Sequence, residues 1–364
     1  MVFNMKYAID IRWMIGSFRG MGRYAWQLID PIKSDTKALG PAGTELTSLA
    51  SIYSGHSFFP YWEQVVQAFL VKRERVEYLI CPYNTGPIFT PRGVKRVLVV
   101  HDLIYMKPFD ELPLSISVYQ TLGRMYRRFI VPRIIEKADY IIAVSEFTKK
   151  EILERYKPKT EVVVIPNSVS PEWLDYEVKP LEKRMAYFIT VAGEAPSKNL
   201  SRLLEAFSSY VNETKDPFTL KVVGINARHH SKFVAISKEL GVERYVEFVG
   251  YVTNEQLMSL YGNAKGFIFA SLFEGFGIPL IEAMATGTPI ACSDTTSLPE
   301  VVGDCGYLFS PYSVESIKNG FLHLSQSHEF LELGVRQGLC RIEKYSETSV
   351  GNQFKEFWST LDGK

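Results

Sequence analysis

Short apolar runs alternate with longer stretches of mixed polarity from one end of the chain to the other. The apolar runs predict strands at residues 7–13, 46–53, 77–81, 96–101, 140–144, 161–165, 185–192, 219–223, 245–249, 266–270 and 290–292. The stretches between them predict helices, of which the clearest span residues 22–32, 61–71, 114–137, 146–156, 200–212, 231–240, 254–263 and 279–286. Such alternation is typical of parallel sheets covered by helices on both faces, so the predicted fold class is α/β.

Residues 167–184 interrupt this alternation, because they carry two prolines, many charges and no clear period. A chain of 364 residues divides into two domains more readily than into one or three. We therefore expect Rossmann-like domains at residues 1–170 and 185–344, joined by a linker at 171–184. Residues 345–364 predict an amphipathic helix with Phe354, Phe357, Trp358 and Leu361 on one face. Because ligands bind at the carboxyl ends of such strands, a cleft between two sheets can hold a donor and an acceptor.

Composition narrows the class of protein. The formal net charge is +1, so no global field attracts nucleic acid or an anionic membrane. The four cysteines are scattered without a C-x-x-C motif, which is typical of reduced thiols in a cytoplasmic protein. The first residues lack the layout of a signal peptide, and no apolar run approaches the ~20 residues of a spanning helix. We expect a cytoplasmic globular protein.

The most informative stretch is 271–289, S-L-F-E-G-F-G-I-P-L-I-E-A-M-A-T-G-T-P. It follows a predicted strand, turns through Gly275 and Gly277, and continues as a helix. The glycines let a ligand approach the backbone, and the helix start offers unpaired N–H groups with a partial positive charge, which suits an anion. Glu274 lies in the turn and Glu282 lies about one turn into the helix. A diphosphate at the helix start, flanked by a sugar and a ribose, would use all of these groups.

The spacing E-G-F-G-x-P-x-x-E-A-M-A-x-G-x-P resembles the E-x7-E segment of family 4 glycosyltransferases, and the similarity continues through residues 297–304. The resemblance implies a GT-B fold and a retaining, metal-independent transferase without a cofactor that uses a nucleotide diphosphate sugar. It implies that Glu282 holds the ribose hydroxyls and that Glu274 contacts the donor sugar. It further implies that backbone amides hold the diphosphate, at Gly275, Phe276, Gly277 and Ile278. In this family the terminal helix crosses back to the first domain.

A second motif, G-E-A-P-S-K-N at residues 193–199, follows the first predicted strand of the second domain. It resembles the G-x-x-x-P-R-K-N turn of related enzymes, in which the lysine that matches Lys198 neutralises the donor diphosphate. A cation suits a leaving group that gains negative charge. Ser197 stands where arginine is common, and we offer Arg23 or Arg19 as the source of the missing charge. The turn at residues 249–254, with Gly250 and Tyr251, matches the place where the family holds the nucleobase.

Two motifs lie at predicted strand ends in the first half. R-G-M-G-R-Y at residues 19–24 resembles the G-x-G-R-Y loop of mannosyl- and rhamnosyltransferase-like members, which assigns Gly22 and Arg23 to donor binding and favours mannose or rhamnose. V-V-H-D-L at residues 99–103 resembles the H-D-L of the family, whose histidine lies near the donor sugar. We expect His101 to donate a hydrogen bond to a sugar hydroxyl or a developing charge.

Other features leave alternatives open. The histidines are dispersed and no D-x-D pair is present, so no metal site is predicted. Four arginines in a stretch with aromatic residues, at positions 124, 127, 128 and 133, fit either a solvated helix face or contact with the inner membrane face, where a lipid-linked acceptor would lie. The predicted partners are the donor and a saccharide or lipid-linked acceptor. The rival functions are a nucleotide-sugar epimerase of the same architecture and a non-catalytic nucleotide-sugar-binding homologue.

Overall fold

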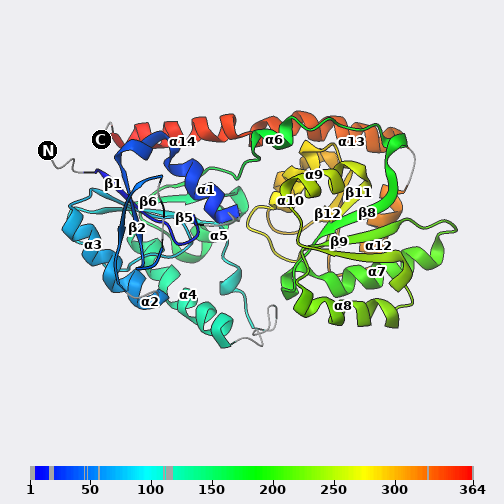
Figure 1. Ribbon diagram of the computed structural model, residues 1–364, viewed down its shortest axis with the longest axis horizontal. Coiled ribbons are helices and arrows are strands. Elements are labelled where there is room, and N and C mark those ends of the chain that lie inside the picture. Colours follow the sequence, from blue (N-terminus) through cyan, green and yellow to red (C-terminus); the bar gives the residue numbers. More distant parts are fainter. Residues whose placement is uncertain are drawn as a thin grey trace. The chain divides into compact units, whose positions relative to one another are not determined.

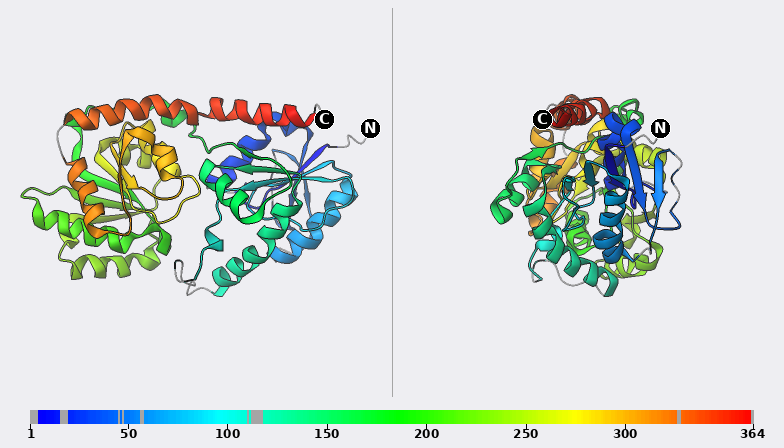
Figure 2. Two further views of the ribbon diagram at one scale, coloured as in Figure 1. Left: turned by 180° about the vertical axis from the view of Figure 1, so that it is seen from behind. Right: turned by 90° about the vertical axis from the view of Figure 1, so that its left-hand side faces the viewer.

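The computed structural model describes residues 5–15, 20–44, 46, 48–55, 58–109, 111, 118–325 and 328–362. The chain forms two compact units: unit 1 comprises Met1–Asn167 with Glu347–Lys364, and unit 2 comprises Ser168–Ser346. In each unit, helices cover both faces of one sheet (Figures 1 and 2). Every strand pairing in both sheets is parallel, which confirms the α/β prediction.

The sheet of unit 1 has the strand order β3-β2-β1-β4-β5-β6-β7. Its strands are β1 Tyr7–Asp10, β2 Thr36–Gly40, β3 Ala50–Tyr53, β4 Tyr78–Cys81, β5 Lys95–Val100, β6 Tyr140–Ala143 and β7 Val162–Val164. Its helices are α1 Gly20–Ile29, α2 Phe59–Tyr61, the π-helical turn η2 Trp62–Val66, α3 Gln67–Glu74, α4 Val118–Lys137, α5 Glu146–Tyr156 and α14 Glu347–Asp362; 3₁₀ turns η1 and η3 span Asp30–Asp35 and Ile104–Met106. The sequence pattern missed β2 and began β3 four residues too early.

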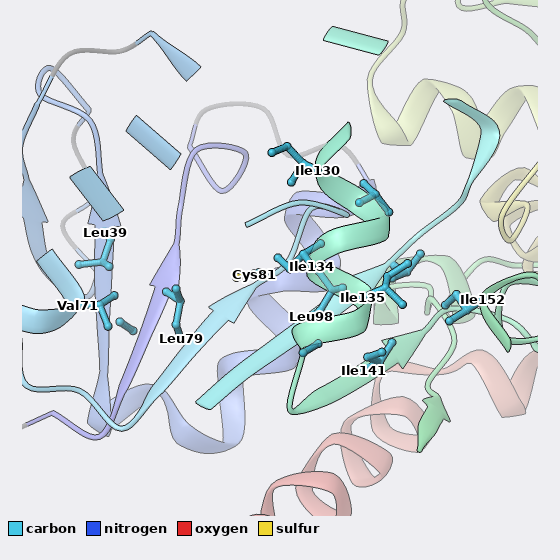
Figure 3. Packing of buried hydrophobic residues seen from close by; sticks show 14 of the residues in the cluster. Leu39, Val71, Leu79, Cys81, Leu98, Ile130, Ile134, Ile135, Ile141 and Ile152 are labelled. Atoms are coloured by element: carbon cyan, nitrogen blue, oxygen red, sulfur yellow. The ribbon is translucent and has the colours of Figure 1, made fainter. Parts of the chain in front are cut away.

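One face of this sheet packs against α3, α4 and α5 through a cluster of buried aliphatic side chains (Figure 3). Leu79, Leu98 and Ile141 of the strands contribute to it, as do Val71 of α3 and Ile134 of α4. The opposite face carries α14. Its four predicted apolar residues are buried. Trp358 stacks edge-on against Tyr7 and donates to the Leu28 carbonyl, and Phe357 packs against Tyr140.

The sheet of unit 2 has the order β10-β9-β8-β11-β12-β13. Its strands are β8 Met185–Val191, β9 Thr219–Val223, β10 Val246–Gly250, β11 Ala264–Phe269, β12 Ile290–Ser293 and β13 Gly306–Phe309. Its helices are α6 Pro171–Leu174, α7 Leu200–Glu213, α8 Ala227–Glu239, α9 Asn254–Asn263, α10 Ile278–Ala285, α11 Leu298–Val302, α12 Val314–Leu324 and α13 His328–Arg341; 3₁₀ turns η4 to η8 span Leu181–Lys183, Pro196–Lys198, Glu243–Tyr245, Gly303–Cys305 and Ile342–Tyr345. The pattern missed β13, α12 and α13.

The segment expected to be a linker, 171–184, is ordered within unit 2. It forms α6 and a 3₁₀ turn, and Trp173 and Leu181 are buried. Arg184 donates to the carbonyls of Lys179 and Gly287, which ties the segment to the turn before β12. The high charge and proline content of residues 171–184 therefore belong to an ordered segment that packs on unit 2.

Candidate active site

The strand order of unit 2 reverses direction between β8 and β11, because β9 and β10 lie on one side of β8 while β12 and β13 lie beyond β11. In parallel α/β sheets, ligands bind outside the carboxyl ends of the strands at such a switch point. The loop after β8 leads to Lys198, and the loop after β11 carries Glu274. Two predicted site residues that are 76 positions apart in sequence therefore meet at this point.

Lys198 and Glu274 form an ion pair in which Lys198 Nζ lies 2.5 Å from Glu274 Oε1. The same carboxylate oxygen accepts from Ser271 Oγ at 2.7 Å. Both charged side chains are partly exposed, at 30% for Lys198 and 16% for Glu274. The pair fixes the position of both groups, and neither charge is sealed from an incoming ligand.

The backbone around Glu274 is held by the loop after β12. The Glu274 amide donates to Thr296 Oγ1 at 3.2 Å, and Ser297 Oγ donates to the carbonyls of Glu274 and Phe276. Thr296 has a positive φ of 59°, which a non-glycine residue rarely adopts. The sequence pattern did not predict Ser271, Thr296 or Ser297 as site residues. A signal for the last was present, since Ser297 opens the S-L-P-E stretch that carries part of the resemblance.

The start of α10 is shaped by Gly277, which has φ +107° and forms the N-cap. A Cβ there would lie 2.7 Å from Leu298 Cδ2, so both the backbone conformation and the space require glycine. Ile278 is the first residue of the helix, and Pro279 in its first turn removes one donor that the helix would leave unpaired. The Leu280 amide donates to the Gly277 carbonyl, so the amides that precede it at the helix start are the ones suited to an anion.

Phe276 and Gly275 flank this helix start, and both are buried. The Phe276 ring packs edge-on against Tyr345 with ring centroids 5.5 Å apart, so only its backbone can serve a ligand. Glu282 is half-buried in α10. Burial, and secondarily the Glu282 carboxylate, raises the pKa of the Tyr261 hydroxyl well above its usual value, which places Glu282 near that core side chain.

The turn after β10 supplies the remaining predicted donor residues of unit 2. Gly250 has φ +77°, and its carbonyl accepts from the Gly224 amide at 2.7 Å. Tyr251 is exposed. Thr253 caps α9 in a reciprocal capping box with Gln256, which ends the turn at a defined residue. The turn therefore presents an open glycine and an exposed aromatic ring at the carboxyl edge of the sheet.

His101 lies in unit 1, directly after β5, and is buried. Its amide donates to Asn84 Oδ1 at 2.6 Å, its Nε2 lies 2.9 Å from the Pro82 carbonyl, and its ring stacks edge-on against Tyr24. Burial lowers the pKa of His101 to about 4, against a smaller opposing effect of the Pro82 carbonyl. The imidazole is therefore neutral at pH 7. Because a carbonyl only accepts, Nε2 carries the proton and Nδ1 is an acceptor.

This tautomer changes the expected role of His101. Its single N–H at neutral pH is already used by Pro82, so the ring can accept a hydrogen bond from a sugar hydroxyl but has no second proton to donate. Gly22 and Arg23 lie near the start of α1 in the same unit. A Cβ on Gly22 would lie 2.1 Å from the Trp13 carbonyl, so close packing of α1 accounts for this glycine. Arg23 is half-buried, and Arg19 lies outside the described residues.

The switch point of unit 1 lies between β1 and β4 and contains a charged network that the sequence pattern did not predict. Arg12 pairs with Asp10 at the end of β1 and with Glu63 of the π-helical turn at 2.9 Å. Glu63 also accepts from Thr85 and Tyr126 hydroxyls at 2.6 Å each. Glu63 is fully buried. Burial lowers the pKa of Arg12, but the two carboxylates outweigh it and the net shift is upward.

Comparison with known proteins connects this geometry to a family. A model described as "Glycosyltransferase Family 4" matches residues 49–173, and one described as "Glycosyl transferases group 1" matches residues 172–332. Among curated proteins, the O-antigen chain mannosyltransferase B of Escherichia coli is 29% identical over 221 residues, which cover 58% of this chain and 58% of that protein. The match thus spans less than two thirds of this relative. Other relatives at 25–29% identity are also mannosyltransferases, and a lipopolysaccharide 1,6-galactosyltransferase is 27% identical.

Solved structures agree on the fold. WaaG, a glycosyltransferase involved in lipopolysaccharide biosynthesis, has a TM-score of 0.73 at 16% identity and covers 96% of this chain and 99% of its own. HepE of Anabaena, solved in complex with UDP, has a TM-score of 0.73 at 14% identity, with coverage of 97% and 99%. These likenesses confirm the expected GT-B fold. The two family models adjoin and together match residues 49–332, and they show that the chain belongs to the family 4 glycosyltransferases.

Proposed function

We propose that the protein transfers a hexose, mannose or rhamnose, from a nucleotide diphosphate sugar to a saccharide or lipid-linked acceptor. The observation that carries the proposal is the Lys198–Glu274 pair at the switch point of unit 2, beside the glycine-capped start of α10. Lys198 and the backbone amides of residues 275–278 bind the diphosphate, Glu274 contacts the donor sugar, and Glu282 holds the ribose. The mannosyltransferase relatives support the choice of sugar.

The proposed transfer retains the configuration of the anomeric carbon and needs no metal. The bond from that carbon to the phosphate oxygen breaks, and the acceptor hydroxyl attacks from the same face. The proton of that hydroxyl passes to the leaving phosphate. No side chain acts as a covalent nucleophile. Lys198 stabilises the charge that accumulates on the diphosphate, which is the contribution a divalent cation would otherwise supply.

A donor panel tests the proposal. GDP, UDP and dTDP are first compared by thermal shift, since a ligand that binds only the folded protein raises its melting temperature. The matching hexose donors are then incubated with candidate acceptors, with and without EDTA, and the anomeric configuration of the product is read by NMR. We expect one nucleotide to stabilise the protein, transfer with retention, and unchanged rates in EDTA. Failure of every nucleotide to shift the melting temperature would contradict the proposal.

The rival functions give different results in the same assay. An epimerase would convert the donor to an epimeric nucleotide sugar when no acceptor is present. A non-catalytic homologue would be stabilised by a nucleotide but would not turn over any donor. Loss of transfer in EDTA, restored by Mg²⁺ or Mn²⁺, would contradict metal independence while leaving the transferase itself in place.

A further inference from the structure

Two helical segments of unit 1 lie on the same face of its sheet and turn their outer faces to solvent. The run 59–74, made of α2, η2 and α3, is anchored on the sheet by Leu70 and Val71, and α4 is anchored by Val131, Ile134 and Ile135. Figure 3 shows Val71, Ile134 and Ile135 in this core. Because both segments bury one side in the same core, their opposite sides face away from the sheet. The residues on those outer sides are large and apolar.

On the run 59–74 the exposed apolar residues are Tyr61, Val65 and Phe69, spaced four apart and therefore on one stripe. On α4 they are Leu122, Met125 and Phe129, which are also in register on one stripe. Phe69 and Phe129 expose 61% and 55% of their surface, and Phe89 in the segment between β4 and β5 exposes 75%. We call these seven residues the apolar face of unit 1.

The two stripes are connected by contacts beneath them. The Tyr126 ring of α4 packs against Phe59 with centroids 5.0 Å apart, and its hydroxyl accepts from Gln64 Nε2 at 2.9 Å. Gln64 Oε1 in turn accepts from the Ile88 amide, which places the neighbouring Phe89 beside the same junction. The apolar face is therefore one surface built on a packed base, and not scattered exposed residues.

Basic side chains border this surface. Arg133 lies over the Phe129 ring at 3.7 Å, and Lys137 lies over the Phe89 ring at 4.1 Å. Lys72 and Arg73 follow Phe69 at the end of α3, and both are exposed. Within 118–137 there are five basic residues and one acidic residue, whereas the whole chain has a net charge of only +1. Arg124 and Arg128 of this set donate to the carbonyls of Tyr105 and Lys107, so Arg133 and Lys137 are the basic residues of α4 that border the exposed apolar residues.

We propose that the apolar face of unit 1 docks the protein on an anionic phospholipid surface. Aromatic and aliphatic side chains can enter the headgroup region while the surrounding Arg and Lys side chains contact lipid phosphates. A second copy of the chain fits less well, because a symmetric contact would bring two surfaces bordered by positive charge against each other. Among the described helices, none is long and apolar enough to span a membrane.

The inference goes beyond the proposed transfer reaction and is tested without it. The full-length protein is floated with vesicles of pure phosphatidylcholine or of equal parts phosphatidylcholine and phosphatidylglycerol. We expect binding to the anionic vesicles only. Phe69→Ser combined with Phe129→Ser should reduce partitioning at least about tenfold, because each ring loses its apolar burial. Arg133→Gln combined with Lys137→Gln should reduce it about 25-fold, at about fivefold for each charge near the surface.

Matched controls replace exposed residues of the same types elsewhere. Tyr312→Ser with Phe330→Ser in unit 2 removes two exposed rings, and Lys150→Gln with Lys232→Gln removes two exposed charges. Both controls should partition like the parent. All altered side chains lie at the surface, and unchanged melting temperatures verify folding. Absence of parent binding, equal binding to both vesicle types, or equal losses in the controls would overturn the proposal. So would a vesicle-free dimer that Phe69→Ser with Phe129→Ser converts to monomer.

Discussion

The switch points of the two sheets differ in how far their charged side chains are exposed to solvent. In unit 2, Lys198 and Glu274 form one ion pair that water and a ligand can both reach. In unit 1, Arg12 pairs with both Asp10 and Glu63 beneath the surface, and Glu63 has no exposed area. A partly exposed pair can exchange partners with a ligand at small cost, whereas a buried pair holds its elements together and is costly to disrupt. The first arrangement suits binding of an anion and the second suits a rigid scaffold.

The largest expected effect comes from breaking the buried network. Arg12→Ala leaves Asp10 and Glu63 buried without their cation, which should lower the free energy of unfolding by about 3–5 kcal/mol. Urea denaturation followed by fluorescence measures the change. Lys150→Ala is the control, because its pair with Glu154 is exposed and should contribute at most about 0.5 kcal/mol. A loss below about 1 kcal/mol for Arg12→Ala would show that the two switch points do not differ in this respect.

Removing the cation of unit 2 should instead affect catalysis. We expect Lys198→Ala to reduce kcat for sugar transfer by about 10²–10³-fold, because the leaving diphosphate loses a donor aimed at its developing charge. The melting temperature should change little. Lys221→Ala is the matched control, since Lys221 pairs with Glu247 at 2.8 Å in the same sheet. Steady-state kinetics with the preferred donor measures kcat and KM. A rise in KM with unchanged kcat would indicate that Lys198 contributes to ground-state binding only.

The buried histidine of unit 1 predicts a pH effect on stability. The pKa of His101 is about 4 when folded and near 6.5 when unfolded, so the unfolded chain binds the extra proton between these values. Its contribution to stability is therefore complete above pH 6.5 and is lost as the pH falls toward 4. Between pH 7 and pH 5 the loss should be about 2 kcal/mol. His101→Gln cannot titrate, so comparing its denaturation with that of the parent at both pH values isolates this contribution.

The same neutrality predicts the shape of the activity profile. Ionisation of His101 should produce no inflection in kcat/KM between pH 6 and pH 8, because the imidazole remains uncharged throughout. An inflection in this range that His101→Gln abolishes would contradict the assignment. It would mean that the ring becomes charged near neutrality despite its burial.

Local sequence patterns predicted the helices and strands whose signals lie in neighbouring residues. The strand, turn and helix around Glu274 were placed within two residues of β11 and α10, because an apolar run, two glycines and a terminal Gly287 mark them. β2 escaped detection because it is short, carries Lys37 and directly follows a 3₁₀ turn. β13 escaped because four residues, Gly306–Phe309, give too little alternation to read.

Long-range polar contacts could not be predicted in this way. Glu63 lies in an otherwise ordinary helical run, where a carboxylate normally faces solvent. Its partners Arg12, Thr85 and Tyr126 are 51, 22 and 63 positions away, and only the folded sheet brings them together. The same holds for Thr296, which supports the Glu274 amide from 22 positions away. Motif resemblance located Lys198 and Glu274 separately, but their direct pairing is a property of the fold.

The smallest expected effect is a change in nucleotide affinity, which tests whether the Lys198–Glu274 ion pair separates when a ligand binds. In Glu274→Gln, the Lys198 ammonium no longer has a charged partner, so a nucleoside diphosphate gains its full attraction without displacing one. Since a partly exposed pair contributes about 0.2–1 kcal/mol, the Kd for the preferred nucleotide should fall up to about fivefold by calorimetry, while kcat declines because the donor sugar loses its carboxylate. Ser271→Ala is the control, since it removes a hydrogen bond to the same oxygen but keeps the charge, and it should leave Kd within twofold, roughly. A higher Kd in Glu274→Gln would mean that the carboxylate orients Lys198 toward the diphosphate and does not compete with it. The proposed difference between the partly exposed pair of unit 2 and the buried network of unit 1 would then no longer hold.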